Sequence, residues 1–138
     1  MGLNFGHYLL ILFSMLFLHI VDDYYLQGIL AKLKQKSWWE KNAPDPLYRN
    51  DYICALAVHA FSWSFVITLP WFIIAFLSLD TGLIIFLILS YLGNTFIHAF
   101  VDHLKANTRD INLLKDQQIH FYQIIATWTI LTLSYIMK

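Results

Sequence analysis

Four long apolar stretches dominate the chain, and short polar connections separate them. They cover about residues 5–30, 52–79, 82–104 and 114–136. Each can supply the roughly 20 apolar residues that a helix needs to cross a bilayer. A spanning segment must satisfy its own backbone hydrogen bonds, so we expect helices. The predicted fold is all-α: a single transmembrane domain over residues 1–138 that forms a four-helix bundle with up-down-up-down topology.

Charge is distributed unevenly among the connections. The first, from Ala31 to Asp51, is basic, and the third carries Lys105 and Arg109, whereas the second has no Lys or Arg. By the positive-inside rule, both basic connections lie in the cytoplasm and both termini lie outside. We therefore expect a multi-pass protein of the inner cell membrane. The cations of the first connection are Lys32, Lys34, Lys36, Lys41 and Arg49.

The composition supports a membrane protein and narrows its partners. Of the 138 residues, 59% are hydrophobic and 13% are charged, whereas roughly a quarter of the residues in a soluble domain are charged. The formal net charge is zero, which argues against a basic surface for nucleic acid. The single cysteine, Cys54, cannot form an intramolecular disulfide. The expected partner is membrane lipid, and a bundle of four short spans is compatible with a homo-oligomer.

Ionisable side chains recur within the spans, close to the basic connections. Three spans each carry one His and one Asp four positions apart, and the second span carries one His. Residues at i and i+4 share a helix face. Because a charge is costly in the bilayer, these faces must point into the bundle and mark a functional site. The residues are His19, Asp23, His59, His98, Asp102, Asp116 and His120.

This combination of side chains predicts a metal site. Imidazole and carboxylate groups bind Zn²⁺, Mn²⁺ and Fe²⁺, and a dication offsets the cost of burying several carboxylates. We expect one or two ions, with zinc as the first choice. An open coordination position would hold a water of lowered pKa that attacks an ester or phosphoester. Asp23 and Asp116 are the candidate catalytic carboxylates. Lys105 and Arg109 lie near enough to hold a phosphate, although their role as topology-setting charges is the stronger interpretation.

Two neighbouring residues are left out of this ligand set. Asp22 is expected to face the headgroups, because it lies beside the stripe that His19 and Asp23 define. His103 is expected to be a solvated residue at the end of its helix.

Three blocks of the sequence, "HIVDDYYLQ", "HAFVDHLK" and "DQQIH", resemble the hallmarks of the family Domain of Unknown Function 3307. Its members are small multi-pass membrane proteins of phages and bacteria. The resemblance spans most of the chain and adds Gln27, Lys105 and Gln117 to the motif positions. The family's His/Asp pattern is similar to that of predicted membrane-bound metal-dependent hydrolases, which implies the same class of activity here. The long first connection, with its Trp and Pro residues, departs from the pattern.

Three functions remain open. The first is a metal-dependent hydrolase of a lipid-like or phosphoester substrate. The second is a metal-ion or proton transporter or channel, which ranks lower because the outer halves of the spans offer Ser and Thr but, near the surface, only His7 and Asp80 as ionisable groups. The third is a non-catalytic phage or bacterial accessory protein in which the metal is structural.

Overall fold

The computed structural model describes residues 3–137, and every regular element in that range is a helix. Within it, four segments are long and apolar enough to cross a membrane: Phe5–Leu26, Pro46–Ser78, Thr81–Thr108 and Leu113–Ile136. The prediction of an all-α bundle is confirmed for this part of the chain. The long helices are α1 (Phe5–Ile20), α4 (Asp51–Ser78), α5 (Thr81–His103) and α6 (Leu113–Ile136).

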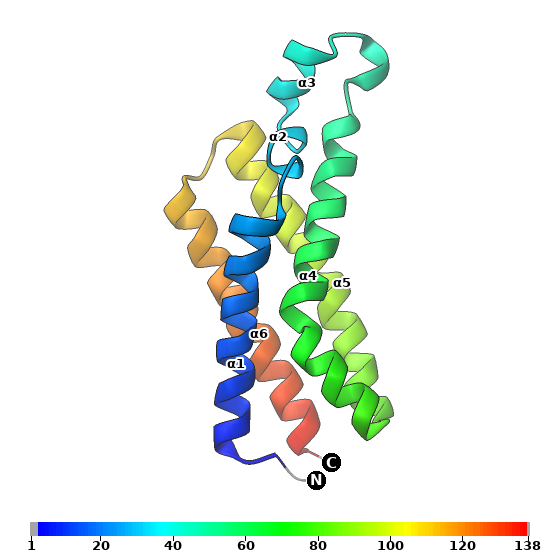
Figure 1. Ribbon diagram of the computed structural model, residues 1–138, viewed down its shortest axis with the longest axis vertical. Helices are drawn as coiled ribbons and strands as arrows, with labels where there is room; N and C mark the ends of the chain where they lie inside the picture. The colour runs from blue at the N-terminus through cyan, green and yellow to red at the C-terminus, as the bar shows by residue number, and fades with distance from the viewer. Residues whose placement is uncertain (1–2, 138) are drawn as a thin grey trace.

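Successive long helices run in alternating directions, so both ends of the described chain lie at the same end of the bundle (Figure 1). Helices α1 and α5 each pack against both α4 and α6. The four helices therefore close around a common interior. We call the end that carries the Lys- and Arg-containing connections the basic end, and the opposite end, where the chain starts and finishes, the terminal end.

The first span is shorter than the sequence indicates. After α1 the chain continues through a π-helical segment, η1 (Val21–Leu26), and then turns at Gly28, whose φ is 51°. Glycine adopts this left-handed conformation without strain, so the helix ends at Leu26 rather than at about residue 30. The first connection then continues at the basic end as α2 (Leu30–Leu33), α3 (Lys36–Asn42) and η2 (Pro46–Tyr48).

Polar caps fix where three of the long helices begin. The side chains of Asn4, Asp80 and Asn112 each accept a hydrogen bond from a backbone N–H in the first turn of α1, α5 and α6, respectively. Such caps satisfy donors that a helix start leaves unpaired. At the basic end, α5 runs on into a second π-helical segment, η3 (Leu104–Thr108). This extension carries Lys105 towards the bundle axis, as described below.

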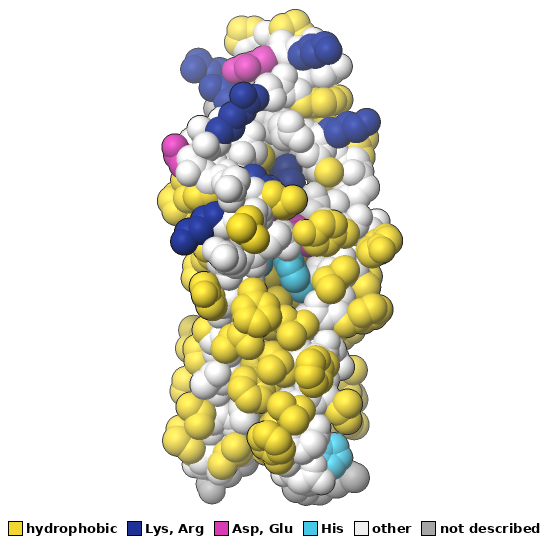
Figure 2. Space-filling view, turned by 90° about the vertical axis from the view of Figure 1, so that its left-hand side faces the viewer, with side chains coloured by type: hydrophobic (Ala, Val, Ile, Leu, Met, Phe, Trp, Pro, Cys, Tyr) yellow, Lys and Arg dark blue, Asp and Glu magenta, His cyan; other side chains and the backbone are white. Residues whose placement is uncertain are grey.

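The apolar core fills the terminal half of the bundle. Trp63 and Trp71 are fully buried in it, so these two tryptophans are core residues rather than interfacial anchors. Outside, hydrophobic side chains cover the lower part of the face in Figure 2, and Lys and Arg side chains gather over the upper part. A broad apolar exterior suits contact with lipid. The core consists of Ile11, Met15, Trp63, Ile67, Trp71, Ala75, Leu83, Leu87, Ile124 and Leu131.

Candidate metal centre

The predicted site residues converge on one buried cluster between the apolar core and the basic end. Segments α1, η1, α4, α5 and α6 all contribute to it. Each of these residues is at most 8% exposed. The helical i, i+4 spacing places each His/Asp pair on an inward face. The residues are His19, Asp23, His59, His98, Asp102, Asp116 and His120.

Six of these residues form three linked groups that could hold a metal ion. In each group, three ligand atoms lie within 4.8 Å of one another. Every two groups share one residue, so the groups close into a ring. Within the described residues, the groups are Asp23, His59 and His98; His98, Asp102 and His120; and Asp23, Asp116 and His120.

The spacing of the ligand atoms suits a small divalent cation. Nε2 of His59 lies 3.2 Å from Nε2 of His98 and 3.4 Å from Oδ1 of Asp23. Nε2 of His120 lies 3.4 Å from Oδ1 of Asp116. Ligands about 2.0 Å from zinc at tetrahedral angles are separated by roughly 3.3 Å. Neighbouring atoms of the cluster therefore need little movement to surround one ion.

The surroundings of His120 bring three acceptor atoms together. Its Nδ1 lies 3.0 Å from Oε1 of Gln123, an acceptor, so Nδ1 carries the proton of the neutral ring. The lone pair of Nε2 then faces Oδ1 of Asp102 at 3.7 Å and Oδ1 of Asp116 at 3.4 Å. These three buried atoms have no hydrogen-bond partner within residues 3–137. Buried acceptors that face one another are costly, and a metal ion or a second proton on the ring removes the conflict.

The charge balance of the cluster also favours a bound cation. Four carboxylates lie in the cluster, and two ammonium groups, from Lys34 and Lys105, contact it. With neutral histidines, two negative charges are left over. Uncompensated buried charge is strongly unfavourable, and one divalent cation would balance it. The carboxylates are those of Asp22, Asp23, Asp102 and Asp116.

His19, which the sequence places among the ligands, is not in any of the metal-binding groups found among the described residues. Both of its ring nitrogens are already used. Nδ1 accepts a hydrogen bond of 2.8 Å from the indole N–H of Trp63, so Nε2 carries the proton and donates to Oε1 of Gln117 at 3.1 Å. In this arrangement His19 orients Gln117, and its role as a metal ligand stays a prediction.

The candidate catalytic carboxylates are held by side-chain amides. Gln117 donates to Oδ2 of Asp23 at 2.8 Å and to Oδ2 of Asp116 at 3.0 Å. Gln27, at the end of η1, donates to Oδ1 of Asp23 at 2.7 Å. Hydrogen bonds of this kind fix the orientation of groups around a metal site. Both glutamines belong to the motif positions, although only the folded chain shows which oxygen each one contacts.

Asp22 corrects one expectation, because it does not face the headgroups. It is 1% exposed, accepts a hydrogen bond of 3.0 Å from Ser62, and lies 3.7 Å from Nδ1 of His59. The physical reason is the π-helical turn, in which the backbone N–H of Gln27 donates to the backbone carbonyl of Asp22, five residues earlier. Wider turns of this type often occur at functional sites, and this one places two consecutive carboxylates inside the bundle.

Two lysines also belong to the cluster. The sequence alone assigns Lys34 only to a basic connection, whereas Lys105 is already a motif position and a candidate phosphate contact. Lys34 is 4% exposed, and its Nζ lies 2.5 Å from Oδ2 of Asp102. Lys105 Nζ lies 2.6 Å from Oδ2 of Asp116. Asn107 of η3 holds the first connection in place, because its side chain donates to the carbonyl of Lys34 and accepts from the N–H of Lys36.

His103 is half-buried rather than fully solvated. Its ring stacks on Tyr52 with the centroids 5.9 Å apart, and its Nδ1 lies 3.3 Å from the amide nitrogen of Asn107. It stays outside the metal-binding groups that the described residues form. Its contacts tie η3 to the start of α4.

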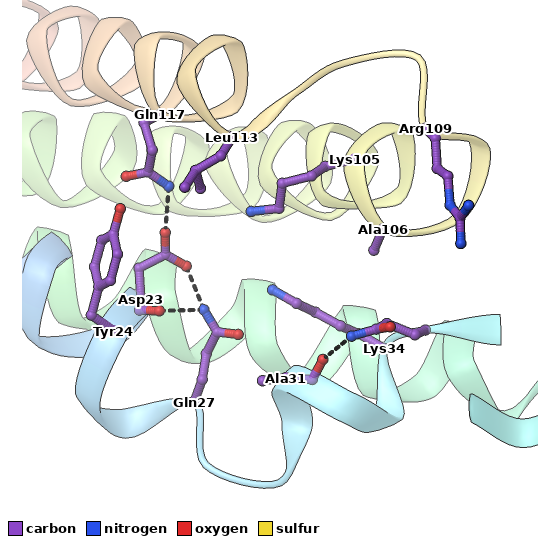
Figure 3. A pocket seen from close by; sticks show the side chains of 11 residues that line it. Asp23, Tyr24, Gln27, Ala31, Lys34, Lys105, Ala106, Arg109, Leu113 and Gln117 are labelled. Atoms are coloured by element: carbon purple, nitrogen blue, oxygen red, sulfur yellow. Dashed lines mark hydrogen bonds between the residues drawn. The ribbon is translucent and has the colours of Figure 1, made fainter. Parts of the chain in front are cut away.

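A cavity of about 390 Å³ opens beside the cluster at the basic end. Asp23 and Gln117 lie at its inner end and also contact the cluster, so the cavity leads to the candidate ligands. Figure 3 shows Lys34 and Lys105 entering from opposite sides, with their ammonium groups directed towards this inner end. Tyr24 and Leu113 line it as well, and both are more than half exposed. The site is therefore buried but accessible.

Trp63 forms the floor of the site. Its ring stacks on His98 with the centroids 4.1 Å apart, and His98 stacks on His120 at the same separation. Trp63 also belongs to the apolar core below. One side chain thus separates the polar cluster from the core and orients His19 through its N–H.

No family model matches the chain, and neither a curated protein nor a solved structure matches it significantly. The resemblance to Domain of Unknown Function 3307 therefore stays a prediction that rests on its three sequence blocks.

Proposed function

We propose that the protein is a membrane-embedded, metal-dependent hydrolase that acts on a lipid-like phosphoester. The observation that carries this proposal is the set of facing acceptors around His120 Nε2, in a cluster whose four carboxylates outnumber the two ammonium groups that contact it, with an open cavity beside it. A structural metal site is closed, whereas a catalytic one keeps an accessible position. The cavity supports the catalytic alternative.

The candidate ligands are His59, His98, His120 and Asp102, together with one oxygen of Asp23 or Asp116. A bound zinc, manganese or iron ion would polarise the ester and lower the pKa of a bound water. Of the two candidate catalytic carboxylates, Asp23 is the better general base. It lines the cavity and is 8% exposed, whereas Asp116 is fully buried. A water that enters from the cavity meets Asp23 first.

The location of the cavity supports a substrate from the membrane. It lies at the basic end, which the positive-inside rule places in the cytoplasm. A phosphoester in the inner leaflet of the cell membrane would then present its headgroup at the level of the cavity. The exposed apolar side chains of Tyr24 and Leu113 at the cavity suit contact with the rest of such an amphiphile.

The decisive experiment is elemental analysis of protein purified in a neutral detergent without chelators. We expect about one or two zinc, manganese or iron ions per chain, and loss of metal in His98→Ala and Asp116→Ala. His7→Ala serves as a control, because His7 belongs to the start of α1 at the terminal end. A wild-type protein that is folded and contains no such metal would refute the proposal.

Activity is tested on the metal-loaded protein with a short-chain phosphatidate, and phosphate release is measured. We expect Asp23→Asn to reduce turnover more than it reduces metal content. If the metal is retained and a panel of phosphoesters shows no turnover, the site is structural, as in the accessory-protein alternative.

A transporter is the second candidate, because a polar chain continues from the cluster into the bundle. Gln123 contacts His120 and lies 3.4 Å from Asn94, which donates to Thr127 at 2.7 Å. Beyond Thr127, buried Leu83 and Leu131 belong to the apolar core. This core favours a closed site. Metal flux into proteoliposomes that disappears in His59→Ala would instead establish transport.

A further inference from the structure

The cavity beside the cluster carries more positive charge than membrane topology requires. Lys34 and Arg109 line it from the residues directly after α2 and η3, and Lys105 lines it from η3 (Figure 3). A cation that only sets topology stays in water, but Lys34 is 4% exposed. The burial of this ammonium group needs another explanation.

The two lysines bond to carboxylates that the metal-binding groups also use. Lys34 lies 2.5 Å from Oδ2 of Asp102. Lys105 lies 2.6 Å from Oδ2 of Asp116 and 3.7 Å from Oδ1 of Asp102. The other oxygen of each carboxylate, Oδ1, faces His120 Nε2 and has no hydrogen-bond partner within the described residues. A metal ion bound there neutralises the carboxylates and weakens their hold on the ammonium groups. Metal binding therefore releases part of this positive charge next to the cavity.

The charge of the cluster specifies what the released ammonium groups would bind. One dication balances the four carboxylates together with the two lysines. A second dication in another of the three linked groups would leave a surplus of two positive charges. A phosphate monoester carries about −1.5 to −2 near neutral pH. Its charge and its oxygen acceptors match two ammonium groups and a guanidinium.

We propose that this cavity binds the phosphate monoester group of the substrate through Lys34, Lys105 and Arg109, and that metal binding at the cluster strengthens this interaction. The inference rests on the proposed metal centre and narrows its substrate to phosphate monoesters. A volume of about 390 Å³ is at the small end of ligand pockets. It admits a headgroup, while Tyr24 and Leu113 provide an apolar rim for an attached chain.

The test measures equilibrium binding to the full-length protein in a neutral detergent. The probes are dioctanoyl phosphatidate, inorganic phosphate and, as a lipid without a monoester, dioctanoyl phosphatidylcholine. Each is titrated into protein loaded with zinc and desalted, and into protein stripped with a chelator. We expect zinc to increase the affinity for phosphatidate by about tenfold, since coupling between sites usually amounts to 5–150-fold, and we expect weak binding of phosphatidylcholine.

The two phosphate probes distinguish a lipid from a soluble molecule as the source of the phosphate group. Tighter binding of phosphatidate supports a lipid headgroup, and equal binding of inorganic phosphate supports a soluble phosphomonoester. Lys105→Met and Lys34→Met should each remove most of the metal dependence. Arg109→Gln is a milder variant, because Arg109 is exposed, and it should weaken binding about tenfold. Lys32→Met, on the exposed side of α2, is the matched control.

The inference is overturned if neither phosphate probe binds, or if Arg109→Gln and Lys105→Met bind phosphatidate as the wild type does. It is equally overturned if loading with zinc leaves the affinity unchanged. Metal content is measured on the same samples. If folded protein retains its metal but fails these tests, the proposal of a metal-dependent hydrolase still stands and only the proposed phosphate site is refuted.

Discussion

The indole N–H of Trp63 donates a hydrogen bond of 2.8 Å to Nδ1 of His19. This bond determines the tautomer of His19, whose Nε2–H then points to Oε1 of the Gln117 side chain. The amide nitrogen of Gln117 is consequently directed at Asp23 and Asp116. A core tryptophan thereby sets the orientation of both candidate catalytic carboxylates.

We therefore expect Trp63→Phe to weaken metal binding. The change removes the N–H donor and leaves the tautomer of His19 unfixed. Loss of such an orienting partner typically costs about 10–100-fold in metal affinity. Zinc affinity is measured by competition with a chromogenic chelator.

Trp71→Phe is the matched control for this experiment. Trp71 is equally buried in the core, but its indole nitrogen has no hydrogen-bond partner within the described chain. The Trp71→Phe variant should lose about as much stability as Trp63→Phe does and keep its zinc affinity. Equal losses of affinity in the two variants would show that packing alone matters.

A second prediction concerns Asp22, which lies next to Nδ1 of His59 on the ring edge away from Asp23. Asp22→Asn should lower zinc affinity by about tenfold, because a carboxylate that contacts a metal-binding histidine orients the ring and raises its basicity. The comparison variant is Asp45→Asn, in the exposed first connection. An unchanged zinc affinity in Asp22→Asn would show that Asp22 does not contribute to metal binding.

Lys34→Met should destabilise the protein. The change removes the nearer ammonium partner of the fully buried Asp102 carboxylate and leaves only Lys105, at 3.7 Å. Breaking a buried ion pair costs up to about 3–5 kcal/mol. Thermal unfolding in detergent measures the loss. Added zinc should restore much of the stability, because a cation at Asp102 replaces the missing charge.

Lys32→Met should leave the melting temperature unchanged, since surface substitutions usually remain within about 0.5 kcal/mol. If zinc does not rescue Lys34→Met while the wild type binds zinc, Asp102 is not a ligand.

A final pair of variants tests the backbone conformation at two glycines. Gly93 lies within α5, and beyond its own chain neighbours and the local helix backbone, no atom of the described residues lies within 4 Å of the position of an added Cβ. Gly93→Ala should stabilise the protein by about 0.5–1 kcal/mol, because alanine loses less conformational entropy in a helix. Gly28→Ala should destabilise it by about 1–2 kcal/mol, since Gly28 has a positive φ. Chemical unfolding of both variants in the same detergent gives the comparison.

The sequence by itself determined the spans and most of the cluster. Long apolar stretches fix the helices because a bilayer leaves the backbone no other partners. The His and Asp residues four positions apart could be assigned to common faces because helical periodicity is local. The spacing of His98 and Asp102, for example, needs no knowledge of the other helices.

Only the tertiary structure decided the roles of Asp22, His19 and Lys34. Asp22 depends on a π-helical turn, which a regular period of 3.6 residues does not anticipate. His19 accepts a hydrogen bond from Trp63, 44 residues further along the chain, and this bond sets its tautomer. Lys34 reaches Asp102 because Gly28 and Asn107 shape the first connection. These contacts join residues that are distant in sequence, and their formation depends on packing among helices rather than on any local pattern.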